Sequence, residues 1–268
     1  MAKNDKIEIT ADEYKKRVCF TDDFFFGRLM QDKELCRQLA ETLLGIKVES
    51  VEFHETQRVL RREKHSHGIQ LDVMLEDSRR VIVFEAQMSN KGDIERRTRF
   101  YQGVLDTATL PKGSSYRSLK DTYVVFICTF DPFKLGLPVY TVRQTYEEAH
   151  EVKYDDGTNA IFYNCPAWEQ CKSEQPRALM KYAHTQVAES DFTRKVDEWL
   201  EDERQRQRLR SEYMTYQMKL DETLEEGIAI GVREKALETA RNLLTMGFGI
   251  EQTAQAVGLS VDEVASLL

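Results

Sequence analysis

Two acidic residues and an amide, Asp72, Glu85 and Gln87, follow one another at a spacing that two neighbouring β-strands can bring together. In residues 69–75 and 81–87, every second side chain is apolar, which fits the two-residue period of a strand with a buried face. A register that puts both apolar faces on one side of the sheet gathers the three polar side chains on the other side. We therefore expect this polar trio to share one face of a β-hairpin.

The turn of the predicted hairpin is expected at the polar pair Asp77-Ser78. An even-numbered loop centred on this pair sets Asp72 opposite Val83 and stacks the apolar residues of both strands together. An odd-numbered loop would send the two apolar faces to opposite sides of the sheet. Packing therefore selects the register that also gathers the polar trio.

Two carboxylates at neighbouring cross-strand positions repel each other unless a cation compensates their charge. Mg²⁺ suits such a pair, because it takes oxygen ligands from one or two carboxylates together with waters and substrate phosphate; Mn²⁺ and Ca²⁺ are alternatives. A metal ion there would polarise a phosphodiester and lower the pKa of a water for in-line attack. Gln87 is no base at neutral pH, but its amide can hold the attacking water or a phosphate oxygen. The trio therefore predicts a metal-dependent phosphodiesterase.

The same spacing also fits a simpler interpretation. Acidic side chains on the second face of a strand are often only solvated, and the pattern D-x12-E-x-Q is loose. Burial of that whole face beneath a covering helix would favour the catalytic interpretation.

The composition indicates a globular protein. The chain has 268 residues, of which 41% are hydrophobic and 31% charged, and its length suffices for one core plus an appendage. The net charge of −8 argues against a protein that coats nucleic acid without specificity, but it does not exclude a nuclease.

No apolar run approaches the roughly 20 residues that span a bilayer, and no apolar stretch follows the first lysines. We expect a cytoplasmic protein without a membrane partner, whose five cysteines, none in a CxxC pair, are reduced.

Hydrophobic periodicity predicts an α/β fold in which helices and strands alternate. Besides the hairpin, we expect a helix over 24–44 capped by Thr21 or Asp22, a strand over 48–62, a helix over 93–110, a buried strand over 122–130, and strands over 139–146 and 160–163. The expected organisation is an arm over 1–20, an α/β domain over 21–175, a charged helical connector over 176–216 and a helical module over 217–268.

Seven segments follow one another along the chain: FTDDFFFGRLM, LDVMLED, VIVFEAQ, ERRTRFY, PKGSSYRSL, TYVVFICTF and the tail EEGIAIGVREKALETARNLLTMGFGIEQTAQAVGLSVDEV. In order and spacing they resemble the PD-(D/E)XK nuclease superfamily and, within it, the bacterial Rpn family of recombination-promoting nucleases and transposase-like proteins. The resemblance implies a restriction-endonuclease-like mixed β-sheet flanked by helices, with a helical C-terminal module. It also implies a Mg²⁺-dependent DNA endonuclease linked to DNA recombination or mobile elements.

The resemblance implies roles for individual residues as well. It assigns metal ligation to Asp72, Glu85 and the backbone carbonyl of Ala86, and it places Arg97 and Tyr101 near the phosphate. The amide of the trio stands where the superfamily usually has lysine, and the Rpn family is known to carry this variant.

An acid on the first helix of this fold often assists the metal site. Asp23 is the candidate for this accessory role, with Asp32 and Glu34 as rivals.

Two basic segments flank the acidic centre. Arg61 and Arg62 precede the first strand of the hairpin, and Lys91 follows the second strand. Phosphate contacts of this kind position a duplex without reading its sequence. We expect these residues to contact DNA together with Arg97 and Tyr101, which stand one helical turn apart. A single arginine of these segments fits a solvated surface equally well.

The tail over 250–268 has the outline of a helix-turn-helix. No lysine or arginine follows Arg241, while Glu251, Asp262 and Glu263 are acidic. A recognition helix without cations binds DNA poorly. We therefore expect packing or self-association, such as a homo-oligomer through the C-terminal helices.

Two other functions stay open. The first is a DNA-binding or assembly protein that keeps the fold but does not cleave, which the replacement of lysine by Gln87 favours. The second is a nuclease that acts on RNA.

Overall fold

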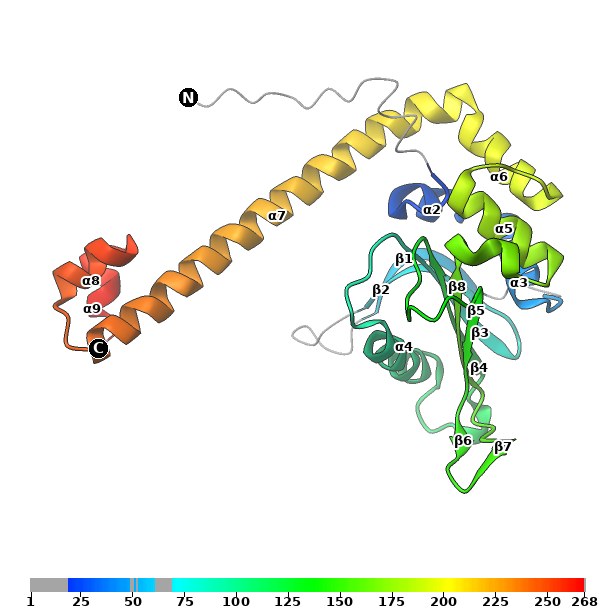
Figure 1. Cartoon of the computed structure of the whole chain (residues 1–268), viewed down its shortest axis with the longest axis horizontal. Coiled ribbons are helices and arrows are strands. Elements are labelled where there is room, and N and C mark those ends of the chain that lie inside the picture. The colour runs from blue at the N-terminus through cyan, green and yellow to red at the C-terminus, as the bar shows by residue number, and fades with distance from the viewer. Residues whose placement is uncertain (1–18, 49–50, 52, 61–68, 268) are drawn as a thin grey trace. The chain divides into compact units, whose positions relative to one another are not determined.

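The computed structural model describes residues 19–48, 51, 53–60 and 69–267. Within these residues, six strands form one mixed sheet, which Figure 1 shows nearly edge-on. The strand order is β1-β2-β3-β4-β8-β5. Strands β1, β2 and β3 are antiparallel neighbours, β3, β4 and β8 run parallel, and β5 is antiparallel to β8. The bounds are Phe53–Leu60 (β1), Ile69–Glu76 (β2), Arg80–Gln87 (β3), Asp121–Cys128 (β4), Val139–Val142 (β5) and Thr158–Asn164 (β8).

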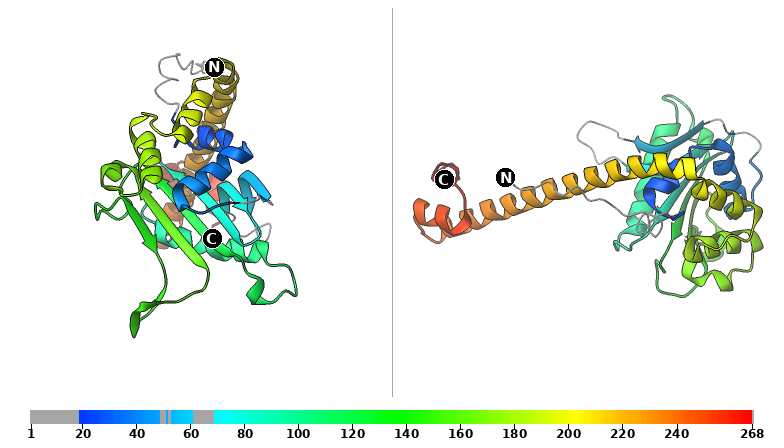
Figure 2. Two further views of the ribbon diagram at one scale, coloured as in Figure 1. Left: turned by 90° about the vertical axis from the view of Figure 1, so that its right-hand side faces the viewer. Right: turned by 90° about the horizontal axis from the view of Figure 1, so that it is seen from above.

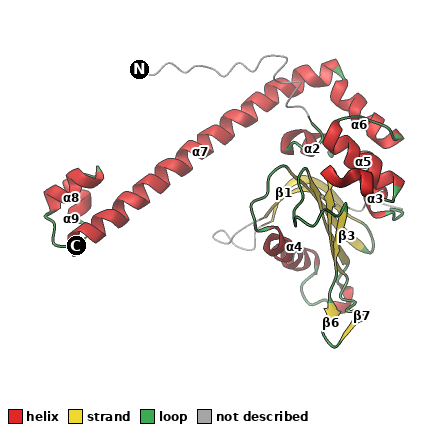
Figure 3. Ribbon diagram, in the orientation of Figure 1, coloured by secondary structure: helices red, strands yellow, loops and turns green. Residues whose placement is uncertain are grey.

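Helices flank both faces of this sheet (Figure 3). On one face, α4 (Ile94–Thr109) joins β3 to β4, and its buried residues recur at steps of four and three, as expected for an amphipathic helix: Ile94, Thr98, Tyr101 and Leu105. On the other face, the hydroxyl of Tyr163 in β8 donates a hydrogen bond to the carbonyl of Leu43 in α3 (Lys33–Leu44). The sheet is therefore buried on both sides.

The predicted single helix over 24–44 is wrong, because the chain forms α2 (Asp23–Leu29) and α3 with a break between them. Asp32 Oδ1 accepts hydrogen bonds from the backbone N–H groups of Glu34 and Leu35 at 2.8 and 3.1 Å, so Asp32 caps a new helix. Asp22, one of the two predicted caps, caps α2 in the same way.

The β2–β3 hairpin turns one residue later than predicted. The Asp77 carboxylate accepts hydrogen bonds from the backbone N–H groups of Arg79 and Arg80 at 2.8 and 2.7 Å. The Asp77 N–H donates to the Arg80 carbonyl at 2.9 Å. Because the Asp77 side chain stabilises this turn, Ser78-Arg79 forms its tip.

The register of the hairpin differs accordingly. Val83 pairs with Met74, so the predicted pairing of Asp72 with Val83 is wrong by two residues. A shift of two residues leaves every side chain on its predicted face, because side chains alternate along a strand.

Strand β6 (Thr145–Tyr146) and strand β7 (Ala149–Lys153) form a separate antiparallel pair. This pair extends beyond the main sheet in two perpendicular views (Figures 1 and 2). The predicted strand over 139–146 therefore comprises β5 and β6. The sequence pattern did not predict β7, whose residues AHEVK offer no alternating apolar face.

The chain divides into two compact units between Gln207 and Arg208. The first unit includes α5 (Glu174–Thr185) and α6 (Asp191–Glu201). The expected division into a charged connector over 176–216 and a helical module over 217–268 stays a prediction. No helix in the described part of the chain combines the length and the apolar character that crossing a membrane requires.

In the second unit, the end of α7 (Glu203–Thr245) packs with α8 (Ile250–Val257) and α9 (Val261–Ala265) around three buried residues: Ala240, Ala254 and Val264. Ser260 and Glu263 form the capping box of α9. Leu224, Ile228 and Val232 of α7 stand at steps of four residues and are all exposed. Self-association through these helices stays a prediction.

Candidate active site

The two acids of the polar trio lie directly opposite each other on β2 and β3. The register pairs Val73 with Phe84, so the next pair along the hairpin is Asp72 and Glu85. The backbone N–H of Asp72 donates to Glu85 Oε1 at 3.1 Å, and the N–H of Ala86 donates to Asp72 Oδ2 at 3.0 Å. Each carboxylate is thus held by the backbone of the opposite strand.

Helix α4 covers this acidic pair. The Tyr101 hydroxyl donates to Glu85 Oε2 at 3.4 Å, and the Tyr101 ring stacks on Phe126 of β4 with ring centroids 6.4 Å apart. Only 3% of the Glu85 surface is exposed. The interpretation of the acids as solvated surface residues therefore does not fit Glu85.

Burial makes the charged forms of both acids unfavourable. Burial raises the pKa of Asp72 to about 7, and the nearby charge of Asp23 adds to the rise, while the Ala86 N–H and Arg97 oppose it. Burial and the charge of Asp72 together raise the pKa of Glu85 well above its ordinary value. Two buried like charges are unfavourable until a proton or a cation neutralises them, so the pair favours the uptake of either.

Gln87 connects the acidic pair to α4. Its Oε1 accepts a hydrogen bond from Arg97 Nη2 at 2.6 Å, and its Nε2 donates to the carbonyl oxygen of Ala86 at 2.9 Å. The Arg97 guanidinium lies over the Phe126 ring, 5.3 Å from its centroid. Arg97 Nε is buried and has no hydrogen-bond partner among the described residues. The Gln87 amide thus links the Arg97 guanidinium to the Ala86 carbonyl, which was predicted to bind metal.

Asp23, the predicted accessory acid, lies within electrostatic range of the pair, because its charge raises the pKa of both Asp72 and Glu85. Burial raises the pKa of Asp23 as well, while the charges of Lys91 and Arg97 oppose that rise. The first residue of α2 and the loop after β3 therefore both contribute charge to the site.

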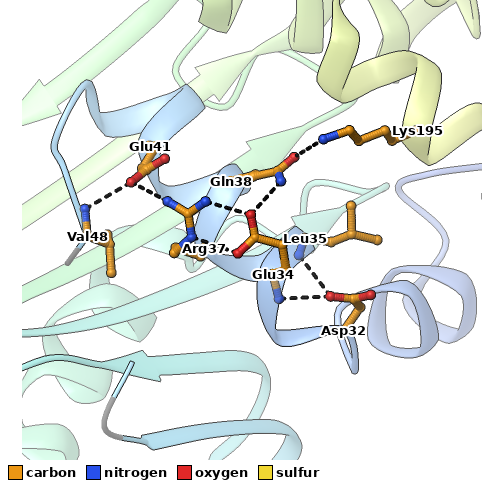
Figure 4. A network of polar contacts seen from close by, with 8 residues as sticks. All are labelled: Asp32, Glu34, Leu35, Arg37, Gln38, Glu41, Val48 and Lys195. Atoms are coloured by element: carbon orange, nitrogen blue, oxygen red, sulfur yellow. Dashed lines mark hydrogen bonds and ion pairs between the residues drawn. The ribbon is translucent and has the colours of Figure 1, made fainter. Parts of the chain in front are cut away.

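The two rivals of Asp23 belong to a different network, on α3 (Figure 4). Asp32 is the N-cap of that helix, and Glu34 accepts hydrogen bonds from Arg37 and Gln38. Neither acid contributes to the pKa shifts of the Asp72–Glu85 pair. The geometry therefore favours Asp23 for the accessory role.

The donor set of the site suits a hard divalent cation. Asp72, Glu85 and the Ala86 carbonyl offer oxygen atoms only, and the pair of acids lacks a directly bonded cationic side chain within the described residues. No group of three or more His, Cys, Asp and Glu side chains able to hold a metal ion occurs in the described parts of the chain. Mg²⁺ needs no such group, since it binds through one or two carboxylates and completes its shell with waters and phosphate. These residues therefore fit Mg²⁺.

Phe126 is a residue of the site that the sequence pattern did not reveal. It pairs with Glu85 across β3 and β4, and it supports both Tyr101 and Arg97. The run TYVVFICTF is apolar throughout, so only the tertiary pairing of β3 with β4 reveals which of its positions face the site. The predicted DNA contacts Arg61 and Arg62 lie outside the described residues.

A family model described as PD-(D/E)XK nuclease family transposase matches residues 21–226, which include every site residue described above. No significant match was found among curated proteins or solved structures. The mixed sheet flanked by helices, with a helical C-terminal region, confirms the predicted restriction-endonuclease-like fold class.

Proposed function

Because the chain belongs to the PD-(D/E)XK nuclease family transposases, we propose that it is a divalent-metal-dependent endonuclease that hydrolyses phosphodiester bonds in DNA during recombination or the movement of mobile elements. One observation carries the proposal: Asp72 and Glu85 face each other beneath α4, with their pKa values raised by burial. Two unneutralised acids in such a place destabilise the fold, so their presence calls for a functional reason.

In this proposal, Asp72, Glu85 and the Ala86 carbonyl hold Mg²⁺, or Mn²⁺ or Ca²⁺ in its place. The bound ion supplies a Lewis acid for the phosphodiester and a water of lowered pKa. Tyr101 orients Glu85 through its hydroxyl, and the backbone N–H of Ala86 orients Asp72.

The cationic side chains of the site give it a way to hold a phosphate. Gln87 and the Phe126 ring hold the Arg97 side chain in place. The guanidinium therefore loses little conformational freedom when it binds a phosphate. Lys91 adds a second positive charge near Asp23. Gln87 itself fixes Arg97 and the Ala86 carbonyl rather than taking a proton.

One observation supports the alternative of a DNA-binding or assembly protein without cleavage. The Gln87 amide already bonds the Ala86 carbonyl, which a metal ion would have to share. In this alternative, Arg97, which Gln87 holds in place, would bind the phosphate backbone and no cleavage would follow.

Plasmid nicking tests the proposal. We expect the purified full chain to nick supercoiled DNA with Mg²⁺ or Mn²⁺, and we expect Asp72→Asn and Glu85→Gln each to reduce the rate by roughly a hundredfold or more, since each removes a metal ligand. Glu95→Gln is the matched control, because Glu95 is an exposed acid in the first turn of α4.

Equal nicking by the wild type and both site variants would indicate a contaminating nuclease and reject the proposal. A wild type that binds DNA but nicks it with none of these ions would support the alternative. Parallel reactions on DNA and RNA would distinguish the two substrates.

A further inference from the structure

The loop after β4, residues 129–138, is attached to the end of the strand that carries Gln87. The Thr129 N–H donates to the Gln87 carbonyl at 3.0 Å, and the Thr129 hydroxyl lies 3.3 Å from the Met88 carbonyl. Asn90 Nδ2 donates to the Pro132 carbonyl at 3.4 Å. The loops that follow β3 and β4 therefore form one continuous rim beside the candidate active site.

A single carboxylate fixes the centre of this loop. The oxygens of Asp131 accept hydrogen bonds from three backbone N–H groups, those of Phe133, Lys134 and Gly136, at 2.7 to 3.1 Å. The Tyr140 hydroxyl donates to the same carboxylate at 2.7 Å. This arrangement holds the loop in one conformation, in which Lys134 has a φ of 58°, a value that residues other than glycine seldom adopt.

The loop is also anchored at its other end and on its inner side. Asn164 at the end of β8 donates through Nδ2 to the Leu137 carbonyl at 2.9 Å, and its backbone N–H donates to the Pro138 carbonyl. The Phe133 ring packs edge-on against Tyr140 and Phe162, each with a centroid distance of 4.9 Å. The loop is thus built into the core beneath α4.

These anchors hold a cation and two large apolar side chains in solvent. Lys134 is exposed, and Leu135 and Leu137 are 69% and 49% exposed. Met88, in the neighbouring loop of the rim, is 53% exposed. The hydrogen-bonded loop thus presents the exposed surface of both leucines, close to that of Met88, where a binding partner can reach it.

We propose that the loop over residues 129–138 is a nucleic-acid contact surface adjoining the active site, in which Lys134 binds a backbone phosphate and Leu135 packs against a sugar or an unstacked base. The inference rests on the proposed function, because a duplex cut at the Asp72–Glu85 pair would continue along the rim that Gln87 shares with the loop. Lys91 and Lys134 give this rim two cations, and its acids are Asp131, which accepts hydrogen bonds from the loop, and Asp93 at the start of α4. Cations beside apolar tips suit a phosphate backbone and its bases, and a loop fixed in advance loses little entropy on binding.

Binding measured without cleavage tests the loop directly. Fluorescence anisotropy of a labelled duplex, with the full chain in a chelator and at several salt concentrations, reports affinity and its salt dependence. We expect Lys134→Gln to weaken binding by roughly threefold to tenfold and to reduce the slope of log affinity against log salt by about one, as the loss of one phosphate contact does. Leu135→Ser should weaken binding with little change in the slope.

The matched controls are Lys153→Gln and Val152→Ser, which change an exposed lysine and an exposed apolar residue of β7. They should leave affinity and slope unchanged. Lys134→Gln removes the charge from an exposed side chain, shortens that side chain by one atom and leaves a residue other than glycine at the positive φ. A folding defect is therefore not expected, and the melting temperature of the variant checks this.

Unchanged affinity and slope for Lys134→Gln and Leu135→Ser would overturn the inference. The inference would also be overturned if Leu135→Ser changed the oligomeric state of the chain in solution and left DNA binding unaltered, since the leucines would then contact protein. Plasmid nicking separates this result from the proposed function. If the wild type nicks plasmid and the loop variants bind DNA normally, only the loop inference is rejected. If the loop variants bind DNA more weakly but the wild type does not nick, only the nuclease proposal is rejected.

Discussion

The first unit contains two acidic clusters built from the same residue types in opposite surroundings. On α3, Glu34 is half-exposed and bonded to Arg37 and Gln38, whose hydrogen bonds lower its pKa to about 2 (Figure 4). On the β2–β3 hairpin, Asp72 and Glu85 are bonded chiefly to backbone N–H groups, and burial raises the pKa of both.

The difference indicates what each cluster is for. An acid whose pKa is lowered is more favourable in the folded chain than in the unfolded chain, so the α3 cluster stabilises the fold, although by little, because solvent screens the exposed Glu34. An acid whose pKa is raised destabilises the fold at neutral pH, so the hairpin pair must be retained for another reason. Substitutions in the two clusters should therefore have opposite effects.

The largest expected effect on stability is a gain from removing a charge at the site. With a chelator present at pH 8, Glu85→Gln should raise the free energy of unfolding by about 1 to 4 kcal/mol, because it relieves the burial of two like charges. Mg²⁺ should stabilise the wild type and not the variant, since a ligand that binds only the folded state adds stability. Thermal unfolding with and without Mg²⁺ measures both effects. A destabilised Glu85→Gln with an unchanged response to Mg²⁺ would show that the pair is structural.

A second, smaller expected effect is the pH dependence of the stability of the metal-free protein. The folded chain binds a proton at Asp72 with a pKa of about 7, whereas the unfolded chain releases it near pH 4, so the stability of the metal-free protein should fall as pH rises from about 4 to 7. The slope is at most about 1.4 kcal/mol per pH unit for each proton. Glu34 contributes with the opposite sign, because its stabilisation is lost as pH falls from about 4.5 towards 2. Urea unfolding across this range tests the sign: stability that rises between pH 5 and 7 in the chelated protein would contradict it.

The sequence predicted the face of the polar trio correctly because side-chain parity along a strand survives any even error in register. The sequence pattern could not predict the two-residue shift in register, since the position of the turn depends on the hydrogen bonds that the Asp77 carboxylate accepts from the backbone N–H groups of Arg79 and Arg80. It also missed the break before α3, where the Asp32 side chain starts a new helix although the apolar periodicity continues. Local side-chain bonds of this kind are invisible to hydrophobic patterns.

The sequence could not predict the contacts within the site, for a different reason. The bond between Arg97 and Gln87 joins α4 to β3, and the position of Phe126 depends on the parallel pairing of β3 with β4. Asp23 was one of three candidates on the first helical segment, and only its tertiary position near Asp72 separates it from Asp32 and Glu34. Residue types and spacing identify the members of such a site, whereas tertiary packing decides which of them meet.

The smallest expected effect returns to α3. Asp32→Ala should lower the free energy of unfolding by about 1 kcal/mol, because the backbone N–H groups of Glu34 and Leu35 lose their cap at the start of the helix. Asp32→Asn should restore most of the loss, since an amide oxygen also accepts these bonds. Neither substitution should change nicking or the response to Mg²⁺, and urea unfolding beside the plasmid assay measures all three quantities. If Asp32→Ala instead lost nicking at unchanged stability, the accessory acid would be Asp32 and not Asp23, and the contrast between a stabilising cluster on α3 and a functional one on the hairpin would fail.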